Sequence, residues 1–158
     1  MTIEETVLSL DVKKVTINVI AKHSDLIPSF ASSGAAGSDV RANIENDVVI
    51  PSGEIRLIPT GLIFEIPEGV EIQIRSRSGL ALKHGVTVLN SPGTIDSDYR
   101  GEVSVILINH SKTDFIVTPK MRIAQLVVAK ILPCQYVQVA SVNSTNRGSG
   151  GFGHTGFC

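Results

Sequence analysis

The sequence has few cysteines, no excess of positive charge and no long apolar run, and each shortage excludes a class of protein. The two cysteines, Cys134 and Cys158, form no disulfide framework, which is typical of a reducing compartment. A net charge of -1 offers nucleic acid no basic surface. No run approaches the ~18 apolar residues of a membrane span, and the N-terminus lacks the basic head of a signal peptide. We therefore expect a cytoplasmic protein without nucleic-acid or membrane partners.

What is present fits one folded domain. The chain has 158 residues, of which 42% are hydrophobic and 18% charged, enough for a real core and unlike a disordered chain. We expect a flexible leader over residues 1–14, a β domain over 15–140 and a mobile, glycine-rich tail over 141–158.

Short β-branched runs separated by turn residues predict an all-β fold, a sandwich or barrel. The expected strands cover residues 15–20, 48–50, 55–58, 62–66, 70–75, 86–89, 103–109, 115–117, 123–128 and 136–139. Pro-x-Gly triplets beginning at Pro51, Pro59 and Pro67 are typical of turns between short strands.

One short helix interrupts this pattern. Ser78 is a good N-cap, helix-forming residues follow it, and Gly85 is placed to end the helix. Arg77, Ser78 and Gly79 would then lie at a helix N-terminus, where free N–H groups favour anions. A plain serine cap beside a surface arginine explains the same residues.

The segment 88–103 carries most of the candidate chemistry. Pro92 and Gly93 predict a turn, so the segment folds back as a β-hairpin or wide loop. In an extended chain, Asp96 and Asp98 share one face and Tyr99 takes the other. The same residues would also serve as a turn former, a core aromatic and a surface charge.

The glycine-rich end admits two interpretations. Five glycines within residues 148–156 cannot pack a core. Arg147, Phe152 and Thr155 would let this segment wrap a polyphosphate once ordered, whereas a flexible terminus is the commoner case.

Five segments stand out in order along the chain: A-A-G-S-D-V (35–40), R-S-G-L-A (77–81), G-T-I-D-S-D-Y-R-G-E (93–102), R-I-A-Q-L (122–126) and R-G-S-G-G-F-G-H-T-G (147–156). Together they resemble the five motifs of the trimeric deoxyuridine triphosphatases (dUTPases). The resemblance implies jelly-roll-like β subunits with one short helix, assembled as homotrimers whose active sites lie between subunits.

The same resemblance implies hydrolysis of dUTP to dUMP and pyrophosphate by in-line water attack at the α-phosphorus. Such an activity keeps uracil out of DNA and supplies dUMP for thymidylate synthesis. Mg²⁺ is expected on the triphosphate oxygens with waters completing its shell, without direct protein ligands. His23, His84 and His110 show no metal-ligand spacing and are expected to be structural.

For the nucleoside, the resemblance implies that Asp96 binds the 3′-hydroxyl and acts as general base. Tyr99 would pack against the sugar and exclude a 2′-hydroxyl, and Asn90 would read the base edge. Further substrate-binding groups are expected at Thr94, Ile95 and Ser104.

For the phosphates and the tail, the implied assignments are as follows. Arg77, Ser78, Gly79 and Gln125 hold the α- and β-phosphates, Arg147 and Thr155 bind the γ-phosphate, and Phe152 with Gly153 covers the uracil. Asp39 is expected to support the site as a second-layer acid or a partner of metal-bound water.

The chain departs from the family pattern at two positions. Ser38 stands where the first motif often has tyrosine, which changes local packing. His154 stands where many relatives have serine, so an imidazole could contact the γ-phosphate and make tail closure pH-sensitive. A substrate affinity that stays flat from about pH 5.5 to 8 would contradict this hypothesis.

Two other classes compete with this interpretation. A deoxycytidine triphosphate deaminase shares the β fold, but the glycine-rich tail motif disfavours it, and ammonia release would reveal it. A non-enzymatic β trimer has no use for both Asp96 and a phosphate-binding set.

Overall fold

The computed structural model describes residues 14–151 of the chain. Within that range the strands are β1 (Asn18–Ala21), β2 (Ser29–Phe30), β3 (Gly37–Arg41), β4 (Val48–Ile50), β5 (Ile55–Glu65), β6 (Val70–Arg75), β7 (Val86–Val88), β8 (Gly93–Ile95), β9 (Val103–Asn109), β10 (Phe115–Val117) and β11 (Arg122–Lys130). The helices are a 3-10 turn, η1 (Ser24–Leu26), and α1 (Ser78–His84). The predicted all-β class with one short α-helix is confirmed.

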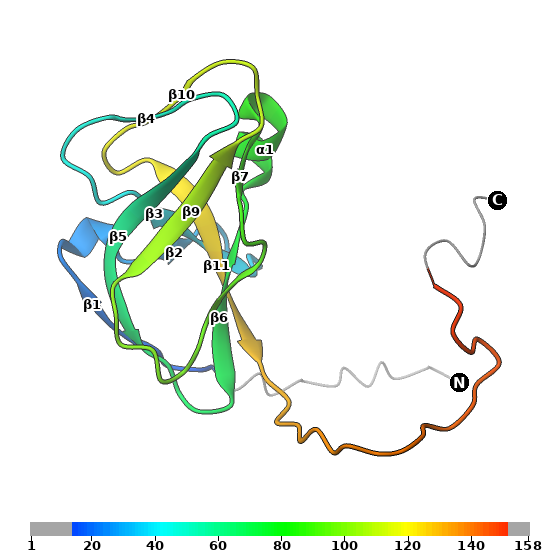
Figure 1. Ribbon diagram of the computed structural model, residues 1–158. Helices are drawn as coiled ribbons and strands as arrows, with labels where there is room; N and C mark the ends of the chain where they lie inside the picture. The colour runs from blue at the N-terminus through cyan, green and yellow to red at the C-terminus, as the bar shows by residue number, and fades with distance from the viewer. Residues whose placement is uncertain (1–13, 152–158) are drawn as a thin grey trace, which may run out of the picture.

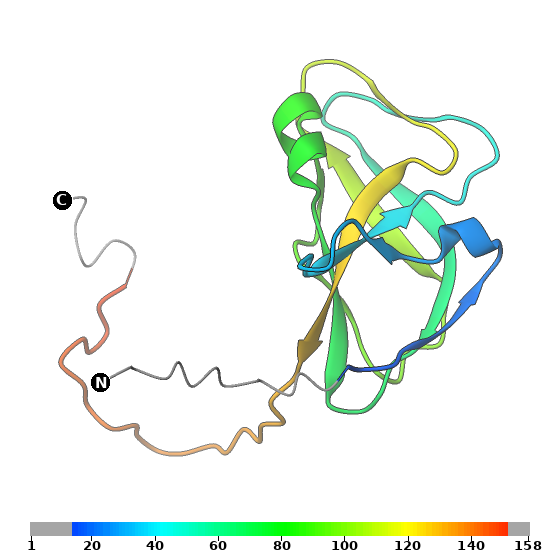
Figure 2. The same cartoon turned by 180° about the vertical axis from the view of Figure 1, so that it is seen from behind.

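Two sheets pack face to face around the core (Figures 1 and 2). One has the strand order β1-β5-β9-β7 and the other β2-β3-β11-β6-β8, while β4 and β10 form a separate pair. In β9 burial alternates along the strand, so that Val105 and Leu107 are fully buried while Ile106 and Ile108 are partly exposed. This alternation is the one expected of a strand with only one face in the core.

Strand β5 corrects one sequence prediction. Pro59-Thr60-Gly61 was expected to be a turn between two strands, but β5 runs through it and pairs with β9 on both sides. The register shifts between Pro59 and Leu62, with Gly61 at φ 70°. The Thr60 hydroxyl donates to the Val103 carbonyl at 2.6 Å. A β-bulge therefore absorbs the proline and glycine, because the neighbouring strand holds the chain in line.

The N-cap of α1 lies one residue earlier in the chain than the sequence predicted. Arg77, not Ser78, is the N-cap, and no side-chain cap bond forms there. Gly85 ends the helix as predicted, with φ 65° and its N–H donating to the Ala81 carbonyl at 3.0 Å. Between residues 14 and 151, neither helix has the length and apolar character needed to cross a membrane.

The chain after β11 extends away from the body of the molecule (Figures 1 and 2). The strand predicted at residues 136–139 is wrong for a single chain: these residues are unpaired, and Tyr136 is 94% exposed. The strand predicted at 15–20 begins only at Asn18. The leader predicted over 1–14 and the tail beyond residue 151 lie largely or wholly outside the described residues.

The segment 88–103 is a wide loop in which one short strand changes sheet. β7 and β9, which flank it, pair with each other in the four-stranded sheet. Between them β8 crosses over and pairs with β6 of the five-stranded sheet, Thr94 opposite Gln73. The loop thereby joins the two sheets at one end of the molecule, and it frames the first cavity described below.

Candidate active site

The wide loop encloses a cavity of about 200 Å³ between β8 and the start of β9, here called the β8 pocket. Its lining residues are Ile74, Asn90, Gly93, Thr94, Ile95, Asp96, Tyr99, Val103 and Ser104. The six residues of the segment 90–104 that are expected to bind the nucleoside are all among them. The structure thus brings this predicted group together, while the role of each member stays a prediction.

The β8 pocket combines an apolar base with a polar rim. Ile95 and Val103 are buried, whereas Asn90 and Thr94 are exposed. Gly93 leaves room for the Asn90 side chain, since a methyl group at residue 93 would lie 3.1 Å from Asn90 Nδ2 and 3.3 Å from Ile74 Cβ. A few placed polar groups over an apolar surface are typical of small-molecule sites.

Asp96 follows β8 directly and its side chain is open to solvent. It lines both the β8 pocket and an adjoining, wider groove of about 650 Å³ that also contains Glu68, Asp98 and Arg100. The Asp96 carbonyl accepts a hydrogen bond from the Tyr99 N–H at 3.2 Å, which closes a turn. A carboxylate that lines both a small pocket and a wider groove can reach both a bound molecule and water.

Tyr99 is held at the rim of the β8 pocket by backbone contacts. Its hydroxyl donates to the Glu102 carbonyl at 3.1 Å. The Glu102 carboxylate in turn accepts from the Gly61 N–H at 2.9 Å. Arg100 Nη1 donates to the Tyr99 carbonyl at 2.9 Å and to the Ser97 carbonyl at 2.7 Å. The turn that carries Asp96 and Tyr99 is therefore fixed from both sides.

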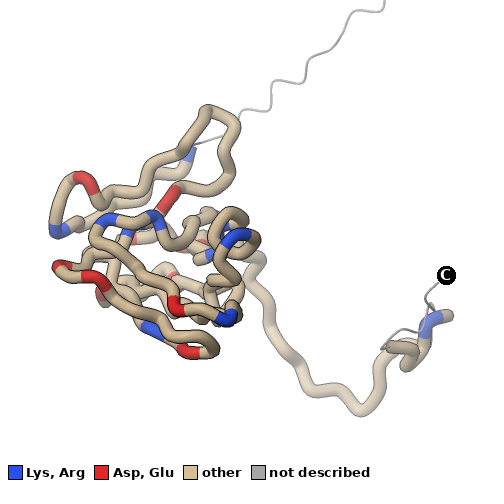
Figure 3. Tube along the Cα trace, turned by 90° about the horizontal axis from the view of Figure 1, so that it is seen from above, with Lys and Arg blue, Asp and Glu red and all other residues tan. Residues whose placement is uncertain are grey.

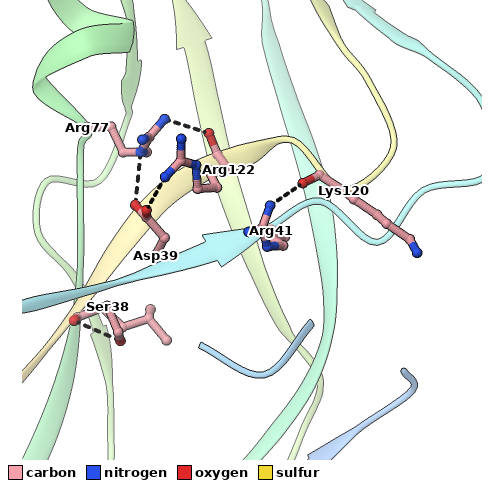
Figure 4. Close-up of polar contacts among 7 residues, drawn as sticks. Ser38, Asp39, Arg41, Arg77, Lys120 and Arg122 are labelled. Carbon is pink, nitrogen blue, oxygen red and sulfur yellow. Dashed lines mark hydrogen bonds and ion pairs between the residues drawn. The ribbon is translucent and has the colours of Figure 1, made fainter. Parts of the chain in front are cut away.

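A second group of polar residues, here called the arginine cluster, consists of Asp39, Arg77 and Arg122 (Figure 4). Arg77 Nε lies 3.0 Å from Asp39 Oδ1, and Arg122 Nη1 lies 3.1 Å from Oδ2. Arg77 Nη1 also donates to the Arg122 carbonyl at 3.2 Å. The Asp39 side chain is only 11% exposed, so these charge-assisted bonds are little screened by water. Asp39 thus lies between two guanidinium groups and orients both.

The five-stranded sheet explains why the arginine cluster forms. In the register of β3, β11 and β6, Gln125 lies opposite Asp39 on one side and Arg75 on the other. Arg77 follows β6 by two residues, and Ser78 and Gly79 are exposed in the first turn of α1. Four predicted phosphate-binding residues, Arg77, Ser78, Gly79 and Gln125, therefore lie around the end of β6, whereas Arg147 does not join them.

Sequence reasoning missed Arg122 as a site residue, although this arginine begins the motif R-I-A-Q-L (122–126). It belongs to the arginine cluster through an ion pair that spans 83 positions of the chain. The only signal in the sequence is its position directly before the apolar run of β11. Its partner can be known only when the strand order is known.

The β8 pocket and the arginine cluster open into different cavities of one chain. Arg77 and Arg122 line a groove of about 540 Å³ beside α1, together with Leu80, His84 and Phe115. The His84 ring packs against the Phe115 ring with centroids 5.3 Å apart, in line with the structural role expected for this histidine. The sequence alone could not show whether Asp96 and Arg77 meet, and within one chain they face separate spaces.

Arg147 lines neither cavity. It is exposed, on the segment that leaves the body after β11 (Figure 1), and its Nε donates to the nearby Gly150 carbonyl at 2.9 Å. Over the body, the positions of Lys and Arg are interspersed with those of Asp and Glu (Figure 3). Phe152, Gly153, His154 and Thr155 lie outside the described residues, so their predicted roles stay predictions.

Ser38 belongs to packing rather than to the arginine cluster. Its side chain is buried and lies away from the Asp39 carboxylate (Figure 4), and its hydroxyl donates to the Leu126 carbonyl at 3.4 Å. It lines an apolar cavity of about 230 Å³ with Phe30 and Phe64.

Among residues 14–151, no three His, Cys, Asp or Glu side chains gather in a way that could hold a metal ion.

Comparisons with known proteins agree on one family. The sequence model of the dUTPase family matches residues 24–156. A deoxyuridine 5′-triphosphate nucleotidohydrolase of Chlamydia pneumoniae is 60% identical over 131 residues, which cover 82% of this chain and 90% of that protein. One from Fusobacterium nucleatum is 51% identical over 144 residues, covering 91% of this chain and 99% of the relative.

Solved structures share the fold. The dUTPase of Staphylococcus bacteriophage 80alpha with dUPNHPP superposes with a TM-score of 0.79 at 25% identity, covering 89% of this chain and 98% of that one. A mutant dUTPase from phage phi11 of S. aureus, described with a coordinated structural Mg(II) ion, has a TM-score of 0.72 at 22% identity over 82% of this chain and 99% of that one.

Proposed function

The chain belongs to the dUTPase family, and on that premise we propose that it hydrolyses dUTP to dUMP and pyrophosphate. The observation that carries the proposal is the β8 pocket, where Asn90, Asp96 and Tyr99 line one cavity. In cells this reaction would remove dUTP before uracil is incorporated into DNA and would supply dUMP for thymidylate synthesis.

Uracil would bind in the closed part of the β8 pocket. The Asn90 amide and main-chain groups near Ser104 would pair with its polar edge. A bound cytosine would cover these groups and leave them unpaired, which rejects a wrong ligand more strongly than a lost apolar contact does. A close fit of the pocket around the base would leave no room for a 5-methyl group, which would exclude thymine.

The deoxyribose would lie between Tyr99 and Asp96. The Tyr99 ring would occupy the space of a 2′-hydroxyl, and the Asp96 carboxylate would accept a hydrogen bond from the 3′-hydroxyl. Asp96 also faces the open groove, from which a water molecule can approach. One carboxylate would thus bind the sugar and position the nucleophile.

In the chemical step, that water would attack the α-phosphorus while Asp96 accepts its proton as general base. The bond from the α-phosphorus to the bridging oxygen breaks, and pyrophosphate leaves with the electron pair. Such phosphoryl chemistry depends mainly on positioning and charge neutralisation. Arg77, Ser78, Gly79 and Gln125 would supply this for the α- and β-phosphates, with Asp39 holding Arg77 in place.

Mg²⁺ fits this site as an ion that arrives with the substrate. The groups near the predicted phosphate site are mainly guanidinium and hydroxyl groups, and the described residues form no carboxylate cage. Triphosphate oxygens and waters would therefore be its ligands, and Mg²⁺ often binds in this way. When bound, the ion would neutralise phosphate charge.

Two features support a homotrimer with shared active sites. The β8 pocket and the arginine cluster face different spaces in one chain, and a neighbouring chain would supply the missing part of each site. The outer side of the four-stranded sheet is also apolar: Ile55 and Leu57 are 44% and 65% exposed and lie opposite Ile108 and Ile106. We call these four residues the apolar outer face. A closed three-fold ring would bury this surface on every chain.

The tail would complete the site. Because residues 131–151 leave their own body, the tail that carries Arg147, Phe152, Gly153 and Thr155 would reach another subunit. Ordering of the tail over the triphosphate would gate turnover. Contact between the His154 imidazole and the γ-phosphate would make this closing step pH-dependent.

The deciding experiment measures pyrophosphate release from dUTP with Mg²⁺ for wild type, Asp96→Asn and Asp98→Asn. Asp98 is the matched control because it is exposed on the same turn and lines the open groove. We expect Asp96→Asn to lose at least about a hundredfold in kcat while binding dUTP, and Asp98→Asn to stay near wild type. Wild type that binds dUTP without releasing pyrophosphate overturns the activity, and ammonia release from dCTP would identify a deaminase. Equal turnover by wild type and Asp96→Asn overturns the role of Asp96.

A further inference from the structure

We propose that Gly101 is a specificity-determining residue that gives the Tyr99 ring its position in the β8 pocket. The inference rests on the proposed function, because it assigns to Gly101 a part in selecting deoxyribose over ribose. Tyr99 lines the pocket and would contact the sugar. Gly101 acts through Tyr99 and is a positioning residue.

The structure shows close packing of Tyr99 on the backbone of Gly101. A methyl group at residue 101 would lie 2.6 Å from Tyr99 Cζ and 3.0 Å from Cε2, and closer still to the hydroxyl oxygen. These distances are too short for carbon atoms, whose optimal separation is roughly 3.5–4.0 Å. The hydroxyl half of the ring therefore occupies the space that any side chain at residue 101 would need.

The backbone gives no other reason for glycine at this position. Gly53, Gly61, Gly69, Gly85 and Gly148 have positive φ angles, and Gly101 is not in this group. The φ of Gly101 therefore lies outside the left-handed range in which an alanine would be strained. Among the glycines within residues 14–151, Gly101 is also the one where a methyl group would come within 3.0 Å of a predicted substrate-binding side chain.

A methyl group at residue 101 would displace the Tyr99 ring without disrupting the fold. Tyr99 is 46% exposed, so its side chain can rotate toward solvent. Rotation would break the hydrogen bond from the Tyr99 hydroxyl to the Glu102 carbonyl. The pocket would lose the wall that excludes a 2′-hydroxyl, while Asp96 and Asn90 keep their positions. Discrimination between deoxyribose and ribose should fall more than catalysis.

The test compares kcat/KM for dUTP and for UTP in wild type, Gly101→Ala and Gly34→Ala. Gly34 is the matched control because it lacks a positive φ and a methyl group there would meet nothing within 4 Å. We expect the dUTP to UTP ratio to fall at least about tenfold in Gly101→Ala, the size typical of a lost steric contact. Gly34→Ala should keep the wild-type ratio. A wild-type ratio in Gly101→Ala overturns the proposal.

A double-mutant cycle then separates an effect through Tyr99 from an independent one. In a Tyr99→Leu background no ring occupies the space above residue 101, so adding Gly101→Ala should leave the ratio unchanged. The same loss in both backgrounds overturns the proposal. If Gly101→Ala alone does not fold, the double variant should recover folding, because the clash has been removed. Failure of the double variant to fold also counts against the proposal.

Tyrosine fluorescence keeps the test independent of turnover. The chain contains no tryptophan and two tyrosines, so in a Tyr136→Phe background the emission comes from Tyr99 alone. Gly101→Ala should shift the exposure of Tyr99 to the quencher iodide, and Gly34→Ala should not. Wild type that fails to hydrolyse dUTP overturns the proposed function, whereas unchanged iodide quenching in Gly101→Ala overturns the role of Gly101.

Discussion

At the scale of single residues, Asp39 shows how one carboxylate can organise two arginines from distant strands. Its side chain is nearly buried and contacts Arg77 and Arg122, whose side chains are 24% and 49% exposed. The bond to Arg77 is the better shielded of the two, and the half-exposed Arg122 contributes less because water screens it. Removing the Asp39 charge would leave Arg77 partly buried without its partner.

We therefore predict that Asp39→Asn destabilises the protein by about 2 kcal/mol and raises KM for dUTP at least about tenfold. The reason is that Arg77 loses the partner that orients it toward the predicted phosphate site. Urea denaturation measures the first effect and steady-state kinetics the second.

Asp47→Asn provides the control for this prediction, because Asp47 is exposed in the loop before β4. It should change neither quantity. If Asp39→Asn lowers stability while KM stays at the wild-type value, Asp39 has a structural role only, and its assignment as a positioning residue is wrong.

At the scale of elements, the end of β9 is fixed by a fully buried amide, Asn109. Its Nδ2 donates to the Ile50 carbonyl at 2.9 Å and to the Thr113 carbonyl at 2.8 Å. Its Oδ1 accepts from the Ser111 N–H at 2.9 Å and from the Ser111 hydroxyl at 2.7 Å. One side chain thus connects β9, β4 and the loop before β10.

Replacing Asn109 with alanine should lower the free energy of unfolding by about 3 kcal/mol, since buried carbonyl and N–H groups would lose their partners. Asn46→Ala, at an exposed loop position, should change it by less than about 0.5 kcal/mol. Chemical denaturation of the two variants compares them directly. Equal stability of both variants would show that water replaces the lost bonds.

The elements also show what sequence reasoning can and cannot reach. The short run rich in β-branched residues at 103–109 predicted β9 with its correct bounds, because such residues favour strands. The Pro59-Thr60-Gly61 triplet led to a wrong prediction of a turn, because the local sequence pattern of a turn and that of a β-bulge are alike. Only pairing with β9 decides between them. The crossing of β8 to the other sheet could not be predicted either, because a strand of three residues shows too little hydrophobic periodicity.

The two parts of the site differ in the same way. Asn90, Asp96 and Tyr99 lie within one loop, so their nearness in the sequence was enough to predict that they would lie close together. Asp39 and Arg122 are far apart in sequence, and their contact follows from the order of strands in the sheet. Chain-local groups can be predicted from motifs, whereas groups that depend on sheet topology require the structure.

At the scale of the whole molecule, the separated cavities and the extended tail lead to a test by subunit mixing. Chains ending at Ala140 would lack the closing tail, and Asp96→Asn chains would lack the general base, so each protein alone should be nearly inactive. Unfolding the two together and refolding them should restore part of the activity. In mixed trimers an intact Asp96 can meet an intact tail from a neighbour.

The control is each protein carried alone through the same unfolding and refolding. Recovery only in the mixture supports sites shared between chains, and light scattering should report a trimer in every sample. A mixture no more active than its components would mean that each tail closes the site of its own chain.

The apolar outer face of the four-stranded sheet also bears on how this protein could be inhibited. A compound that bound Leu57 and Ile106 and kept the chains apart would leave the β8 pocket and the arginine cluster intact, yet no complete site would form. Such a compound needs neither phosphate nor any likeness to a nucleotide. Excess dUTP would not displace it directly, and its potency would fall as the concentration of protein rises, which distinguishes it from a competitive analogue.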